Sequence, residues 1–91
     1  MGEDDEKNLI NIQKHDISLK RAAKVFLDIN RIESEDYFRN GEWRYDVLGM
    51  VDKVLFVVCT DRDADTIRLI SARPATKTEE AVYYGKGNYD S

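Results

Sequence analysis

The sequence predicts an α+β fold in which helices pack on a small antiparallel sheet, in the order α-α-β-β-β-(β)-α. Residues 5–28 carry apolar side chains at helical spacing. Residues 42–73 instead form apolar or alternating segments separated by turn residues, as consecutive strands do. A helix-start pattern then follows the single proline. Because short turns join the strands, neighbouring strands are expected to be antiparallel.

The composition is that of one globular domain spanning 1–91, with residues 1–4 and 86–91 expected to be frayed tails. Of the 91 residues, 42% are hydrophobic and 35% charged, which excludes disordered and collagen-like chains. The longest apolar run covers 54–59, far short of the roughly 20 residues of a membrane-spanning helix. The start lacks the features of a secretory signal, and one cysteine forms no internal disulfide. We therefore expect a cytoplasmic protein with no membrane contact.

The formal charge of −4 comes from one short segment of the chain. Residues 3–6 are all acidic, and the remainder has 14 basic and 14 acidic residues (18 minus 4). Charge alone therefore neither indicates nor excludes an anionic partner.

The first third of the chain predicts two helices. Residues 5–15 run from acidic to basic, as suits a helix dipole, and carry a short apolar stripe of Leu9, Ile12 and Ile10. The Ser18 hydroxyl can cap a second helix. Asp28 and Asn30 end that helix, and one of its faces is expected to be buried, with Leu19, Ala22, Ala23 and Phe26.

The next segments predict the first strands. Residues 32–38 are polar and fit either an edge strand or an irregular loop, and Asn40-Gly41 is a hairpin-turn dipeptide. Residues 42–51 alternate between apolar and polar side chains, with Gly49 as a bulge or bend. The side chains expected in the core are Trp43, Tyr45 and Val47, with Phe56 from the following strand.

The continuous apolar run 54–59 predicts a central strand that is buried on both faces. Residues 61–65 are mostly acidic and predict a loop, and residues 66–73 predict the last strand, which Pro74 ends. Thr76 and Glu79 match a capping box that opens a final helix through Tyr84.

Three stretches together resemble the BrnT-type toxins. The first is KHDIS at 14–18, followed by AA at 22–23 and VFLD at 25–28. The second joins Arg44 and Gly49 to VVCTDR at 57–62. The third and most specific is IRLISARPAT at 67–76, with EE at 79–80 before Tyr83.

The resemblance implies a RelE-like fold and an endoribonuclease that suppresses translation. It also implies an RNA substrate and a BrnA-like ribbon-helix-helix antitoxin, with operator DNA contacted only through the antitoxin complex. From the residues themselves no cofactor is expected, since the sequence has no phosphate-binding glycine motif. Two features depart from the family pattern: an acidic start replaces a short apolar first strand, and the rest of the chain is neutral rather than basic.

Metal-independent RNA cleavage needs a base for the 2′-hydroxyl proton, an acid for the 5′-oxygen and cations that stabilise the phosphorane. His15 is the only imidazole, the side chain best suited to proton transfer near neutral pH. The alternative is a helix-ending residue whose ring bonds the last carbonyls or Asp16. Lys14 can supply charge to a phosphate or simply end the helix in solvent.

Two arginines of the last predicted strand can hold a phosphate through paired hydrogen bonds. Arg68 and Arg73 are five positions apart, so a regular strand places them on opposite faces. They share a site only if a bulge intervenes or Arg73 has already left the strand. The alternative role is an ion pair between sheet and helix.

Two further residues are candidates for RNA contact. Arg62 follows the central strand, in or beside a loop, and could instead pair with the neighbouring aspartates. Tyr83 could stack on a base or pack on the sheet. The sequence thus assigns catalysis to His15, Arg73 and Arg68, and RNA binding to Lys14, Arg62 and Tyr83. One histidine and one cysteine predict no strong zinc site.

A second function from another class stays open, that of a non-catalytic module that binds an antitoxin-like partner. In that case the same arginines would pair with carboxylates of the partner. Direct DNA binding by the chain alone is disfavoured, because no basic recognition helix is visible.

Overall fold

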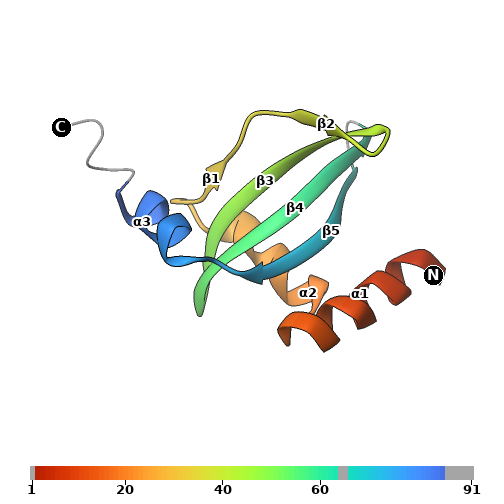
Figure 1. Cartoon of the computed structure of the whole chain (residues 1–91), viewed down its shortest axis with the longest axis horizontal. Coiled ribbons are helices and arrows are strands. Elements are labelled where there is room, and N and C mark those ends of the chain that lie inside the picture. The colour runs from red at the N-terminus through yellow and green to blue at the C-terminus, as the bar shows by residue number, and fades with distance from the viewer. Residues whose placement is uncertain (1, 64–65, 86–91) are drawn as a thin grey trace.

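The computed structural model describes residues 2–63 and 66–85, and Figure 1 shows their arrangement. Helices come first, strands in the middle and a helix last. The helical elements are α1 (Gly2–His15), α2 (Leu19–Ala22), the 3-10 helix η1 (Ala23–Leu27) and α3 (Lys77–Gly85). The strands are β1 (Ile32–Glu33), β2 (Tyr37–Arg39), β3 (Glu42–Val51), β4 (Lys53–Asp63) and β5 (Thr66–Pro74). The α+β class with an antiparallel sheet is therefore confirmed.

The sheet has the strand order β1-β3-β4-β5, and β2 also pairs with β3. All pairs are antiparallel. Tight turns join β2 to β3 and β3 to β4, with positive φ at Asn40 (52°), Gly41 (80°) and Asp52 (67°). The predicted Asn-Gly turn is confirmed. The segment 32–38, expected to be an edge strand or an irregular loop, contains the short strand β1 and the start of the short strand β2.

The main core lies between one face of the sheet and the layer formed by α1, α2 and η1 (Figure 1). Its fully buried side chains alternate along the strands: Val47 from β3, Leu55, Val57 and Cys59 from β4, and Ala72 from β5. A smaller core at the other face joins α3 to β3 and β4 through Tyr83, Leu48 and Val54. The core-facing side chains of β4 are fully buried, whereas on its second face Val54 and Thr60 are buried and Phe56 and Val58 are half-buried. The predicted burial of both faces is therefore confirmed only in part.

The second predicted helix is shorter and tighter than expected. The Ser18 cap is confirmed, since its hydroxyl accepts a hydrogen bond from Arg21 N at 3.0 Å. After Ala22 the chain continues as the 3-10 helix η1, which has about three residues per turn. Val25 therefore joins Ala22 in the core, and Ala23, expected to be buried, is exposed.

The predicted apolar stripe of α1 does not face the core. Leu9 is 60% exposed, Ile10 48% and Ile12 37%. The face turned toward the protein is polar instead, with Asn11 4% exposed and hydrogen bonded at both ends of its amide. The helix also begins at Gly2, earlier than predicted.

Three expectations for the strands are wrong. Trp43 is 62% exposed, because no helix extends over that end of β3, and it packs edge to face with the exposed ring of Phe38. Gly49 sits in regular register with Leu55 and forms no bulge; a Cβ there would lie 2.6 Å from Val25 Cβ. The loop expected over 61–65 is wrong for residues 61–63, which belong to β4, and residues 64–65 lie outside the described part of the chain.

The capping box of α3 is confirmed. Glu79 N donates to Thr76 Oγ1 at 3.2 Å, and Thr76 N donates back to Glu79 Oε1 at 2.9 Å. In the helix Tyr83 is buried and Tyr84 is exposed. The expected tail at 86–91 lies outside the described residues. Within the part that is described, no helix is long and apolar enough to cross a membrane.

Candidate functional site

A cleft of about 340 Å³ opens between the end of α1 and the middle of β5. It brings together three of the predicted site residues: Lys14 and His15 from α1 and Arg73 from β5. Ser71 adds a hydroxyl, and the remaining lining comes from Ile10, Asn11 and Ile70. Residues that are almost sixty positions apart in the chain therefore form one polar site.

Asn11 fixes α1 against β5 and so builds the wall of this cleft. Its Nδ2 donates to Ile17 O at 2.6 Å, and its Oδ1 accepts from Ala72 N at 2.9 Å. The second bond satisfies a backbone N–H on β5, the last strand in the sheet order. Asp16 then ends the helix with a positive φ of 58°, which directs Ile17 into the core. His15 is consequently held on the last turn of a clamped helix.

The basic residues of the last turn of α1, Lys14 and His15, are available to a ligand. His15 is half-buried, and its imidazole makes no hydrogen bond with any residue that the structure describes. The alternative in which the ring bonds the last carbonyls or Asp16 therefore finds no support in the geometry. Lys14 is exposed and forms no ion pair with any side chain that the structure describes. Both side chains border the same cleft as Arg73.

A β-bulge at Ile70 decides the relation between Arg68 and Arg73. Ser71 pairs with Val58 and Leu69 with Cys59, so Ile70 is an extra residue on β5. Arg68 then lies opposite Thr60, and Arg73 opposite Phe56. Because Thr60 and Phe56 are four residues apart on β4, the bulge places both arginines on the same face of the sheet. This is the bulge that the sequence named as a condition.

The Arg73 guanidinium is held by three partners. Glu79 accepts from Nη1 at 2.8 Å and from Nη2 at 2.9 Å, and the Phe56 ring lies 4.2 Å from the guanidinium carbon. Nη1 also donates to Pro74 O at 3.2 Å. The hydrogen bonds from Arg73 lower the pKa of Glu79, and those to Glu79 raise the pKa of Arg73. The sequence signal for Glu79 was its capping box, which gave no hint of this second role.

The ion pair leaves one edge of Arg73 available. Glu79 occupies the edge formed by Nη1 and Nη2, whereas Nε makes no hydrogen bond to any residue in the described ranges. A guanidinium can bind a phosphate through Nε and Nη2 as well as through its end, because both edges present parallel N–H groups. Arg73 can therefore keep Glu79 and still hold an anion in the cleft.

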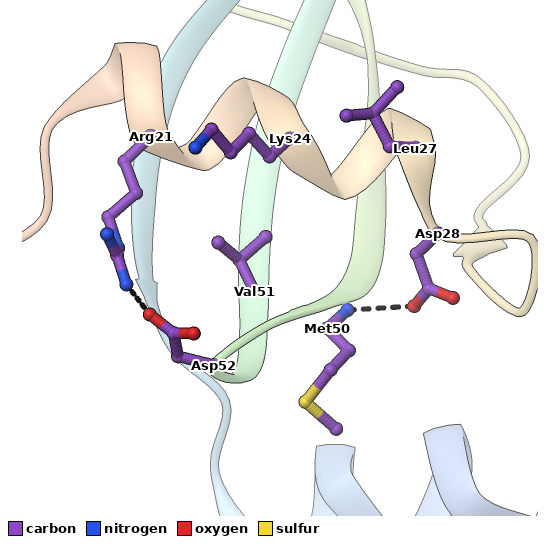
Figure 2. Close-up of a pocket in the computed structure, with 7 residues that line it drawn as sticks. All are labelled: Arg21, Lys24, Leu27, Asp28, Met50, Val51 and Asp52. Carbon is purple, nitrogen blue, oxygen red and sulfur yellow. Dashed lines mark hydrogen bonds and ion pairs between the residues drawn. The ribbon is translucent and has the colours of Figure 1, made fainter.

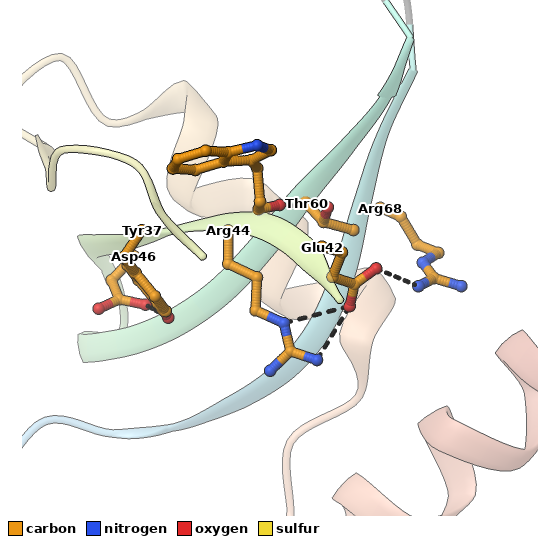
Figure 3. A network of polar contacts seen from close by, with 7 residues as sticks. Tyr37, Glu42, Arg44, Asp46, Thr60 and Arg68 are labelled. Carbon is orange, nitrogen blue, oxygen red and sulfur yellow. Dashed lines mark hydrogen bonds and ion pairs between the residues drawn. The ribbon is translucent and has the colours of Figure 1, made fainter. Parts of the chain in front are cut away.

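Arg68 belongs to a separate polar network on the open face of the sheet, shown in Figure 3. Glu42 lies between two arginines: it accepts from Arg44 Nε at 3.1 Å and Nη2 at 2.9 Å, and it pairs with Arg68 Nη2 at 3.5 Å. Nearby, Tyr37 donates to Asp46 at 2.7 Å. Burial and the Asp46 carboxylate raise the pKa of Tyr37 to about 12, so its phenol stays protonated. The structure does not bring Arg68 to the cleft that His15 borders.

The last two predicted residues lie elsewhere. Tyr83 is 7% exposed, and its hydroxyl donates to the Asp28 carboxylate, which together with burial raises the pKa of Tyr83 to about 12. It ties α3 to the end of η1 and does not line the cleft. Arg62 lies near the end of β4, and its side chain falls outside the described part of the structure.

No group of three or more His, Cys, Asp or Glu side chains that could hold a metal ion occurs among the described residues. The site instead presents an imidazole, an ammonium, a guanidinium and a hydroxyl. These groups can exchange protons and neutralise a phosphate.

The family model described as "Ribonuclease toxin, BrnT, of type II toxin-antitoxin system" matches residues 3–79. The matched stretch includes α1 from its second residue, all of the described strands and the first three residues of α3. It contains the cleft and Glu79 and stops short of Tyr83. No curated protein matches the chain.

Proposed function

The chain belongs to the BrnT family of ribonuclease toxins of type II toxin-antitoxin systems, and we propose that it cleaves RNA in the cleft between α1 and β5. The observation that supports this site most is the convergence of His15, Lys14 and Arg73 on one 340 Å³ cleft. The family description supplies the substrate class, and the cleft supplies the groups that RNA cleavage requires.

In the proposed reaction the 2′-oxygen of a ribose attacks the adjacent phosphorus, and the bond to the 5′-oxygen of the next nucleotide breaks. His15 either takes the proton of the 2′-hydroxyl or gives a proton to the leaving 5′-oxygen, and water carries out the other proton transfer. Arg73 and Lys14 offset the charge of the phosphorane. The products are a 2′,3′-cyclic phosphate and a free 5′-hydroxyl. No metal ion takes part in this proposal.

Glu79 is proposed as the positioning residue of this site. Its two hydrogen bonds and the Phe56 ring hold the Arg73 guanidinium in one orientation. Because Glu79 also accepts from Thr76 N, the same carboxylate fixes the start of α3. Arg73 is thereby preorganised, which reduces the entropy lost on binding the phosphate.

Arg68 and Arg62 are proposed to contact RNA beyond the scissile phosphate. The bulge at Ile70 puts Arg68 on the same face of the sheet as Arg73, nearer the start of β5. Glu42 orients Arg68 and Glu79 orients Arg73, so neither of these two guanidinium groups is free in solvent. A buried Tyr83 suits support of α3 better than base stacking, so we assign it no RNA contact.

In the cell we propose that cleavage inhibits translation in the cytoplasm, and that a BrnA-like ribbon-helix-helix antitoxin neutralises the toxin and carries the contact with operator DNA. A RelE-like relationship is part of the same proposal. Membership of a type II family implies an antitoxin partner. The ribbon-helix-helix fold of that antitoxin is the part of the proposal that needs a test.

The test is cleavage of end-labelled RNA in excess EDTA, with the product ends identified. We expect wild-type cleavage that leaves cyclic phosphate ends, and loss of cleavage in folded Arg73→Ala. Arg39→Ala, an exposed arginine on β2, is the matched control and should cleave normally. A chain that binds its antitoxin but cuts no RNA, even with ribosomes present, would instead support the non-catalytic binding module.

A further inference from the structure

A second hollow, of about 400 Å³, lies between the α2–η1 helix and the turn from β3 to β4 (Figure 2). Arg21, Lys24 and Leu27 line its helical side, and Met50, Val51 and Asp52 line the side of the turn. It shares no lining residue with the cleft at His15. We name this hollow the η1 groove.

Two large aliphatic side chains stand exposed where η1 ends. Leu27, which lines the groove, is 79% exposed, and Ile29, two residues further on, is 89% exposed. Exposing two neighbouring aliphatic side chains to this degree has no folding benefit, because neither removes its apolar surface from water. Apolar surface beside a hollow and bordered by charges is typical of protein interaction sites.

The backbone that carries these side chains is fixed. Asp28, between Leu27 and Ile29, accepts from Met50 N at 2.8 Å, from Asn30 N at 2.9 Å and from the Tyr83 hydroxyl. One carboxylate thus ties the end of η1 to β3 and to α3. The two aliphatic side chains are therefore presented on a rigid turn, which lowers the entropy lost on binding.

The charge around the groove selects the kind of partner. Its two carboxylates are already engaged, Asp52 with Arg21 and Asp28 with the donors named above. Lys20 and Lys24 are exposed on the same helical segment and form no ion pair within the described residues. Uncompensated lysines beside apolar side chains complement a partner segment that is both acidic and aliphatic.

We propose that the η1 groove is a docking site for the antitoxin, occupied by an acidic segment that carries a bulky aliphatic side chain. That side chain packs on Leu27, Met50 and Val51, and its flanking carboxylates meet Lys24 and Lys20. The inference takes the antitoxin from the proposed function but does not depend on where RNA is cut, because the groove and the cleft are separate.

The test is the affinity of the purified chain for its cognate antitoxin, measured by calorimetry without RNA. Leu27→Asp and Lys24→Glu are each expected to weaken binding at least about tenfold, the loss typical of a central interface residue. The matched controls are Leu9→Asp, an exposed leucine on α1, and Lys77→Glu, an exposed lysine on α3. Both controls should bind within about twofold of wild type.

Wild-type affinity in both Leu27→Asp and Lys24→Glu would overturn the proposal. So would a loss of RNA binding in these variants without a loss of antitoxin binding, since the groove would then serve RNA. Because Lys24 is exposed, Lys24→Glu is expected to fold, and its affinity for the antitoxin tests the proposal even if Leu27→Asp does not fold. If the wild-type chain cleaves no RNA but these variants lose affinity for the antitoxin, the proposed function is wrong and the docking site at the η1 groove is supported.

Discussion

Arg73 on β5 and Glu79 on α3 form a two-bond ion pair, with oxygen–nitrogen distances of 2.8 and 2.9 Å. The same Glu79 carboxylate accepts from Thr76 N, so the orientation of Arg73 and the start of α3 depend on one side chain. In the proposed site this pair holds the guanidinium that binds phosphate. Changes at Glu79 should therefore affect activity more than the loss of one surface ion pair would suggest.

Glu79→Gln should reduce RNA cleavage by up to about 100-fold, because a misplaced site cation loses transition-state stabilisation. The uncharged amide can still cap α3 but cannot accept two charge-assisted hydrogen bonds. The matched control is Glu80→Gln on the same helical turn, which should cleave at the wild-type rate. Single-turnover kinetics on labelled RNA measures the effect. Equal rates in the two variants would contradict a positioning role for Glu79.

The stability of the fold should fall at acid pH through the same pair. Because the native pKa of Glu79 is lowered, mainly by its hydrogen bonds with Arg73, the pair stabilises the fold above the ordinary glutamate pKa of 4.5. The contribution is lost as the pH falls through the lowered pKa. Denaturant unfolding from pH 6 to pH 2.5 should show a smaller decrease for Glu79→Gln than for wild type. Parallel curves would mean that the pair contributes nothing to stability.

Asn11→Ala should release α1 from β5. It leaves Ala72 N and Ile17 O without their partner, and each buried unsatisfied group costs about 1–3 kcal/mol. Hydrogen exchange should accelerate across α1, and cleavage should fall because His15 is carried by this helix. The control is Gln13→Ala, an exposed change on the same helix. Unchanged exchange in Asn11→Ala would show that other contacts hold α1 in place.

Gly49→Ala should destabilise the protein by about 1–3 kcal/mol, the usual cost of overpacking a filled core. The added Cβ would lie 2.6 Å from Val25 Cβ and 3.1 Å from Val25 Cα, so the backbone of η1 would have to move. Gly85→Ala is the control, since its Cβ would have nothing within 4 Å. Thermal unfolding of the two variants tests the difference. A Gly49→Ala variant as stable as wild type would show that η1 can shift freely.

Features set by neighbouring residues could be predicted from the sequence. The Ser18 cap, the Asn40-Gly41 turn and the box of Thr76 and Glu79 are local hydrogen-bond patterns, and each is present as expected. The exposure of a side chain was harder to predict, because it depends on which element of the fold covers that side chain. Trp43 alternates correctly along β3, yet that end of the strand lies beyond the helical layer.

The site needed information that only the tertiary structure holds. The sequence indicated His15, Lys14 and Arg73 separately, but their convergence follows from the clamp at Asn11, whose pairing with Ala72 spans the chain. The bulge that aligns Arg68 with Arg73 could be named only as a condition, since its position depends on strand register. The apolar stripe of α1 was wrongly predicted to be buried for the same reason. Helical periodicity shows which residues share a face, but not whether that face turns toward the core.

The most direct test of the account is chemical rescue of His15→Ala. The variant should cleave RNA in EDTA about 10²- to 10⁴-fold more slowly than wild type, the usual contribution of a general acid or base. Added imidazole should restore part of the rate in proportion to its concentration, and it should not restore Arg73→Ala. If His15→Ala cleaves at the wild-type rate, or if imidazole restores both variants alike, His15 does not transfer the proton and the proposed site is wrong.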